Sequence, residues 1–167
     1  DIGSWHVAVL NSNCTLAGGC AAGSPQATWL QADLAASTKP CILAAWHHPL
    51  FTSAAVYDGK SEVIPLWQIL QAAGADVVLN GHAHGYERFA RQLADGTANT
   101  ATGIREFVVG TGGAELYPMA GVSPNSEVRN DTTFGVLRLK LSASSYSWTF
   151  LPVAGSTFTD AGTTACH

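Results

Sequence analysis

The sequence carries little charge. Only 8 lysines and arginines and 12 aspartates and glutamates occur in 167 residues, and no run of basic residues is present. This scarcity argues against nucleic acid or an anionic membrane surface as a partner, because both are recognised by clustered positive charge. The chain also lacks an apolar run of the roughly 20 residues that a membrane-spanning helix needs. Its content of 47% apolar residues predicts one globular domain with a real core.

Cysteine is scarce as well, and the four cysteines form no CxxC pair. Cys14 and Cys20 flank a short glycine-bearing loop that a local disulfide could close, which leaves Cys41 and Cys166 for a second bridge. Four free thiols in a cytosolic protein are the alternative. We favour two disulfides and a secreted or extracytoplasmic protein, because the polar residues are mainly Ser, Thr, Asn and Gln. The first ten residues lack the basic segment of a signal peptide, so we expect a leader to have been removed or to lie upstream.

Apolar periodicity predicts an α/β fold with two parts. The first part, within residues 1–92, alternates strands and helices in the order strand 5–12, helix 24–37, strand 41–48, helix 61–74 and strand 75–82. The second part, within residues 104–155, has three antiparallel strands joined by turns rich in glycine and serine, at 105–113, 134–142 and 145–153. We therefore expect a β-α-β-α-β unit followed by a β-meander in one domain.

Four of the six histidines follow two of the predicted strands. They are His47 and His48 after the strand 41–48, and His82 and His84 after the strand 75–82. The carboxyl ends of neighbouring parallel strands lie side by side, so these histidines are expected to converge on one crevice. Neutral imidazole is the commonest protein ligand for transition metals, which favours a metal site over simple hydrogen bonding. Gly81 and Gly85 are expected to give the backbone the tight path that this site needs. His6 and His167 are assigned no role in the site.

Two segments around these histidines resemble a known family. The segments AAWHHPLFTS (44–53) and LNGHAHGYERF (79–89) are similar to the last two motifs of the calcineurin-like metallophosphoesterases. The similarity is strongest to the branch that includes purple acid phosphatases and exported bacterial phosphatases and phosphodiesterases. The string G-H-x-H-x-Y-E-R after an apolar strand is specific. Residues 3–14, 23–34 and 103–113 are also similar, in order and spacing, to segments of the exported bacterial members.

The resemblance implies the C-terminal half of a four-layer α-β-β-α sandwich that hydrolyses phosphate esters at a dinuclear metal site. It assigns His47 and His82 to one metal ion and His84 to the other, with Fe, Zn or Mn as the expected ions. His48 has no fixed metal role in the family. We expect it either to contact the phosphate or its leaving group as a catalytic residue, or only to hydrogen-bond.

The residues between and after the ligands are given supporting roles. Tyr86, Glu87 and Arg88 are expected to brace the loop, with Glu87 and Arg88 as a structural ion pair. Ala83 and Gly85 stand where some relatives carry acidic residues, which would loosen the contacts that orient the ligand imidazoles.

The family's N-terminal motifs do not occur in these 167 residues. They are D-x-H, a G-D motif whose aspartate bridges the two metals, and G-N-H-[DE], which supplies an asparagine ligand and an acid histidine. Three neutral imidazoles would leave the charge of two ions uncompensated. We therefore expect this chain alone to bind at most one ion weakly and to be nearly inactive. The expected partner is an N-terminal half of the same domain, upstream or as a separate chain, and an isolated piece would expose a strand edge.

Two other functions remain open at this point. The chain could be an inactive remnant or non-catalytic binding module that keeps the half-fold. A serine hydrolase is the weakest alternative, because the sequence has no G-x-S-x-G motif. The leading prediction is a hydrolase for a small phosphomonoester or phosphodiester.

Overall fold

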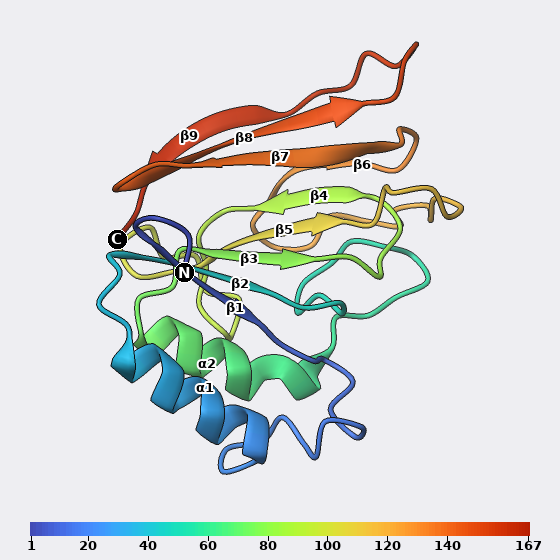
Figure 1. The fold of residues 1–167 in the computed structure, drawn as a ribbon. Coiled ribbons are helices and arrows are strands. Elements are labelled where there is room, and N and C mark those ends of the chain that lie inside the picture. The colour runs from blue at the N-terminus through green and yellow to red at the C-terminus, as the bar shows by residue number, and fades with distance from the viewer.

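The computed structural model describes residues 1–167 as three stacked layers (Figure 1). Two helices cover one face of a six-stranded sheet, the first sheet, and a three-stranded second sheet covers the other face. An α-β-β stack is what one half of a four-layer α-β-β-α sandwich contains, so the predicted fold class is confirmed. Neither helix is long and apolar enough to cross a membrane.

The elements in chain order are β1 (Trp5–Val9), α1 (Pro25–Ala36), β2 (Cys41–Ala45), the 3-10 turn η1 (Ser61–Val63), α2 (Ile64–Ala72), β3 (Val77–Asn80), β4 (Tyr86–Phe89), β5 (Arg105–Val109), β6 (Ser126–Asn130), β7 (Gly135–Leu141), β8 (Ser145–Pro152) and β9 (Ala161–Ala165). The first sheet has the order β1-β2-β3-β5-β4-β6, and the second has β7-β8-β9.

Parallel pairing of β1, β2, β3 and β5 brings their carboxyl ends to one edge of the first sheet. The sequence of β2, CILAA, is apolar throughout, as expected for a parallel strand with both faces covered. The first helix, α1, begins after Ser24, whose hydroxyl accepts the Ala27 N–H. The helical crossovers from β1 to β2 and from β2 to β3 place the segments that follow β1, β2 and β3 next to one another.

The second half begins its meander one strand later than predicted. The segment expected at 105–113 forms β5, which pairs in parallel with β3 inside the first sheet. The meander consists of β7, β8 and β9. Two strands that the sequence pattern did not indicate, β4 and β6, extend the first sheet with antiparallel pairing.

A buried polar network ties the first sheet to the second, and we call it the Asp160 network. The Asp160 carboxylate accepts hydrogen bonds from the Tyr86 hydroxyl and Arg88 Nε, each at 2.7 Å, and from Trp148 Nε1 at 3.0 Å. The Arg88 guanidinium also lies over the Trp148 ring, 5.0 Å from its centroid. Strands β4 and β8, from different sheets, are thereby held to the segment before β9.

The expected ion pair between Glu87 and Arg88 is wrong. Successive residues of a strand point to opposite faces of the sheet, so the two side chains diverge. Arg88 pairs with Asp160. Glu87 is fully buried and accepts the Ser53 N–H at 2.8 Å and the hydroxyls of Ser53 and Ser126 at 2.5 Å. The Glu87 carboxylate therefore braces the loop after β2 and makes no ion pair with Arg88.

The two favoured disulfides are present. Cys14 and Cys20 close the local loop after β1, and Cys41 at the start of β2 is joined to Cys166 just after β9. No free cysteine remains. The second bridge connects residues 125 positions apart and fixes the second sheet to the first.

Candidate metal centre

Three histidines lie together at the carboxyl ends of β2 and β3, and we call them the histidine cluster: His47, His48 and His82. One ring nitrogen from each lies within 4.8 Å of the others. His82 Nδ1 is 3.0 Å from His47 Nε2, and the His48 and His82 ring centroids are 4.3 Å apart. The two strand ends are joined by a hydrogen bond from the Gly81 N–H to the His47 carbonyl at 3.0 Å. The edge thus brings together three of the four predicted histidines.

The backbone at His82 is unusual. Its φ of 58° lies in the left-handed region, which residues other than glycine seldom adopt. Neither Gly81 nor Gly85 has a positive φ, so the left-handed residue of this segment is His82. Gly85 is needed for close packing, because a Cβ there would lie 2.9 Å from Met119 Cε and 3.3 Å from the Asn130 carbonyl. Backbone strain of the His82 kind concentrates at functional sites.

The histidine cluster contains no carboxylate. Burial and the neighbouring imidazoles of His48 and His47 lower the pKa of His82 to about 4. Burial, followed by the charge of Lys60, also lowers the pKa of His48. Both rings are therefore neutral at neutral pH. A neutral imidazole has the free lone pair that a metal ion requires, so the donor set fits a transition metal.

His84 lies outside the cluster and is fixed by different contacts. Its Nδ1 is 2.7 Å from the Glu115 carbonyl, so Nδ1 carries the proton because a carbonyl only accepts. Its ring stacks on Tyr117 with centroids 4.2 Å apart and planes inclined by 16°. This arrangement leaves the Nε2 lone pair free, and a backbone carbonyl on the other nitrogen is typical of metal-ligating histidines.

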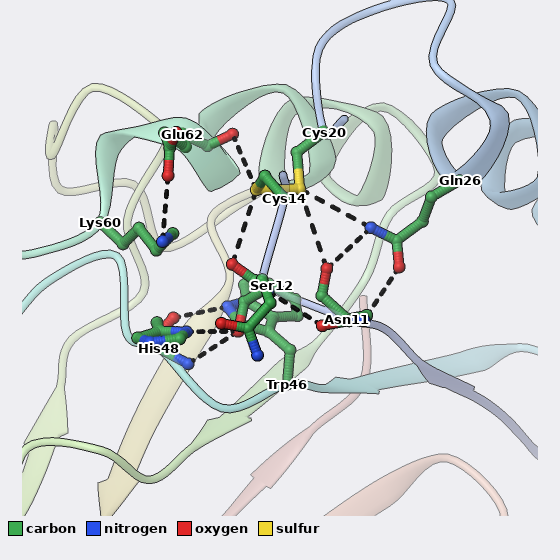
Figure 2. Close-up of polar contacts among 10 residues, drawn as sticks. Asn11, Ser12, Cys14, Cys20, Gln26, Trp46, His48, Lys60 and Glu62 are labelled. Atoms are coloured by element: carbon green, nitrogen blue, oxygen red, sulfur yellow. Dashed lines mark hydrogen bonds and ion pairs between the residues drawn. A yellow bond between two sulfur atoms is a disulfide. The ribbon is translucent and has the colours of Figure 1, made fainter. Parts of the chain in front are cut away.

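One polar residue of this edge was missed by sequence reasoning. Ser12 follows β1, and its Oγ lies 2.8 Å from His48 Nδ1 and accepts the His48 backbone N–H at 3.0 Å (Figure 2). A single serine in a polar loop carries no distinctive sequence signal. Its position at the carboxyl end of the predicted strand 5–12 was the clue that could have placed it at the same edge.

A second buried carboxylate also escaped sequence reasoning. Glu106 on β5 is fully buried and accepts the backbone N–H groups of Leu50 at 2.9 Å and Phe51 at 3.2 Å. Burial raises the pKa of Glu106, and the two N–H groups oppose that rise. Together with Glu87, it anchors the loop that follows His48 to β4 and β5.

The remaining two histidines take no part in the site. His6 Nδ1 lies 2.9 Å from Asp1 and its Nε2 lies 2.8 Å from Asp33. The backbone N–H of His167 donates to Asp76 at 2.8 Å. Both histidines have carboxylate partners away from the cluster.

The amino-acid sequence is similar to those of several purple acid phosphatases. No family model matches the chain. Purple acid phosphatase 22 of Arabidopsis thaliana is 35% identical over 127 residues, which cover 71% of this chain and 29% of that protein. Purple acid phosphatase 18 of the same plant is 29% identical over 138 residues, which cover 76% and 31%. The chain therefore spans about three tenths of the length of these relatives.

Solved structures show the same fold. A purple acid phosphatase from yellow lupin (Lupinus luteus) seeds superposes with a TM-score of 0.85 at 20% identity, over 99% of this chain and 32% of that one. GAP50, the anchor in the inner membrane complex of Plasmodium, superposes with a TM-score of 0.71 at 14% identity, over 93% and 48%. These matches support the calcineurin-like metallophosphoesterase superfamily, in its C-terminal portion. Within that superfamily its curated relatives are purple acid phosphatases, which confirms the resemblance found in the sequence.

Proposed function

We propose that this chain supplies the histidine side of a metal-dependent phosphoester hydrolase. The observation that carries the proposal is the pair of imidazole nitrogens, His47 Nε2 and His82 Nδ1, that face each other at 3.0 Å. Two ring nitrogens facing each other at that distance have room for only one proton between them, and a bound cation could accept a lone pair from each. The substrate would be a small phosphomonoester or phosphodiester.

In this proposal His47 and His82 hold one ion and His84 Nε2 holds part of a second site. Fe, Zn and Mn are the expected metals, since imidazole suits ions of this class. Bound ions of this kind act as Lewis acids toward the phosphoryl group. The carboxylates that would balance their charge must come from an N-terminal half of the domain, so this chain alone is expected to bind at most one ion weakly.

His48 has a different part in the proposal. It is buried beside His47, and its ring lies near enough to His47 and His82 to contact a phosphoryl oxygen or the leaving group of a substrate held there. Its role would be to orient the substrate, and its backbone is held by Ser12 and by Trp46, whose Nε1–H donates to the His48 carbonyl at 2.8 Å.

The two disulfides support a secreted or extracytoplasmic location. Disulfides persist in oxidising compartments and are rare in the cytosol. The bridges Cys14–Cys20 and Cys41–Cys166 leave no free thiol.

A non-catalytic binding module that keeps this half-fold is the second candidate. The observation that favours it is the absence of any carboxylate from the histidine cluster. The two candidates differ in whether the edge binds a transition metal.

Metal binding by the double variant His47→Ala plus His82→Ala tests the proposal. We expect the affinity of the chain for Zn²⁺ or Mn²⁺, measured by titration calorimetry, to fall at least about 100-fold, because mutation even of supporting groups around a metal costs 10–100-fold. His6→Ala is the matched control and should bind as the parent does. Equal binding by the double variant and the parent would favour the non-catalytic module. Hydrolysis of p-nitrophenyl phosphate and its bis-ester, with an N-terminal half restored, then assigns the ester class.

A further inference from the structure

We propose that Ser12 is a positioning residue that fixes the tautomer of His48, so that His48 presents an N–H donor to the histidine cluster. His48 would then bind a phosphoryl oxygen and would not act as a third metal ligand. The inference rests on the proposed function for the identity of the acceptor. The tautomer itself is a property of the metal-free chain.

Contacts on both sides of Ser12 hold its backbone in place (Figure 2). The preceding Asn11 is clamped by the side-chain amide of Gln26, which accepts the Asn11 N–H at 2.7 Å and donates to its carbonyl at 2.9 Å. The disulfide Cys14–Cys20 closes the loop on the other side. Ser12 is only 1% exposed, so water does not compete for its hydroxyl.

The Ser12 hydroxyl has two partners, and both belong to His48. Its oxygen accepts the His48 backbone N–H at 3.0 Å. Its own proton needs an acceptor, because a buried hydroxyl proton without a partner is unfavourable. His48 Nδ1, at 2.8 Å, is the only other atom within hydrogen-bonding distance of this oxygen. Nδ1 is therefore the acceptor, and the ring proton resides on Nε2.

This assignment separates His48 from the other histidines of the edge. His84 donates from Nδ1 to a carbonyl and keeps a free lone pair on Nε2, which is the form that binds metal. His48 has the opposite tautomer, so its free position is an N–H. A phosphoryl oxygen accepts a hydrogen bond from such a group, whereas a metal ion is repelled by it. Ser12 thereby turns a third imidazole of the cluster into a substrate contact.

Three neighbouring strand ends contribute residues to this edge. The segments after β1, β2 and β3 contribute Ser12, the His47–His48 pair and His82 respectively, and the parallel pairing of these strands sets them side by side. Removing the hydroxyl should free the His48 ring without changing the ligand pair of His47 and His82.

The test is NMR of the metal-free chain with ¹⁵N-labelled histidine, at a pH where the rings are neutral. We compare the parent with Ser12→Ala and with Thr111→Val as matched control, because Thr111 is also 1% exposed and donates its hydroxyl to the Gly135 carbonyl. We expect one His48 tautomer, protonated at Nε2, in the parent and the control. Ser12→Ala should show a mixture of both tautomers.

A second readout is the affinity of the Zn²⁺-loaded chain for inorganic phosphate. Loss of a fixed donor should weaken phosphate binding about fivefold in Ser12→Ala, the effect of one hydrogen bond, with Zn²⁺ affinity unchanged. Protonation of His48 at Nδ1 in the parent would overturn the inference, and so would unchanged tautomer and phosphate affinity in Ser12→Ala. Failure of the parent to bind Zn²⁺ would instead count against the proposed function, and the tautomer result would stand.

Discussion

The chain contains two groups of polar side chains that are built in opposite ways, the buried Asp160 network and the histidine cluster, in which only His48 is buried. In the Asp160 network, the carboxylate faces a guanidinium, a phenol and an indole, each of which donates to it. In the histidine cluster, three like groups meet with no carboxylate among them, and two of their nitrogens face each other. Opposite charges with matched donors hold a fold together. Like groups with spare lone pairs stay together only because the backbone forces them, which is how a ligand site is built.

The largest expected effect comes from breaking the Asp160 network. Asp160→Ala leaves Arg88 buried with its main partner gone, and loss of one member of a buried pair costs about 3–5 kcal/mol. We expect the free energy of unfolding, from urea titration, to fall by that amount. Glu127→Gln is the control, because Glu127 also pairs with Arg88 but is 38% exposed and should cost less than about 1 kcal/mol. A small loss in Asp160→Ala would mean that the network contributes little.

The histidine cluster and the Asp160 network should affect folding stability in different pH ranges. The folded-state pKa of His82 is about 4 against 6.5 for an unfolded histidine. The unfolded chain therefore binds more protons between these values, and stability falls as the pH drops from about 6.5 to 4. Burial opposes ionisation of Asp160, but the hydrogen bonds from Arg88 and Tyr86 outweigh it and lower the pKa of that carboxyl. Its contribution is therefore retained until the pH falls below 3.8, the ordinary value for aspartate.

Urea unfolding at several pH values between 4 and 7 measures this difference. We expect His82→Ala to lose much of the slope in that window, on the order of 1–2 kcal/mol after allowance for solvent screening. His6→Ala should keep the slope of the parent. Parallel profiles for the parent and His82→Ala would show that the cluster does not disfavour protonation.

The smallest effect concerns the left-handed backbone of His82. At an ordinary site glycine is less stable than alanine, but at φ 58° an L-residue with a Cβ is strained. We expect His82→Gly to be more stable than His82→Ala by about 1 kcal/mol. Thermal unfolding of the two variants measures this difference. Both variants lack the imidazole ring, so its loss affects them equally. Greater stability of the alanine variant would show that the backbone relaxes once the imidazole is removed.

Sequence reasoning recovered the parts of the fold that local patterns encode. The apolar runs gave β1, β2 and β3, and the rule that parallel strand ends meet placed His47, His48 and His82 together. The strand β9, with the sequence AGTTA, has no apolar alternation to signal it. It is held by pairing with β8 and by the bridge at Cys166, which follows it.

The misses at the site share one physical cause, which is dependence on contacts far apart in the sequence. Arg88 finds Asp160 72 residues later, and Leu50 finds Glu106 56 residues later. Ser12 meets His48 only because β1 pairs with β2. The expected Glu87–Arg88 pair failed because adjacency in sequence was taken for adjacency in space, and a strand separates neighbours.

The bridge between Cys41 and Cys166 makes most of the chain a covalent ring. The polar loop 93–103 lies inside that ring and is exposed over much of residues 95–102, so it offers a site for proteolytic cleavage. A single cut there opens the ring without releasing a fragment, because residues on both sides of the cut remain joined through the bridge. The strand ends that carry His47 and His82 would stay on one molecule. The nicked protein would run as one band on a non-reducing gel and as two after reduction.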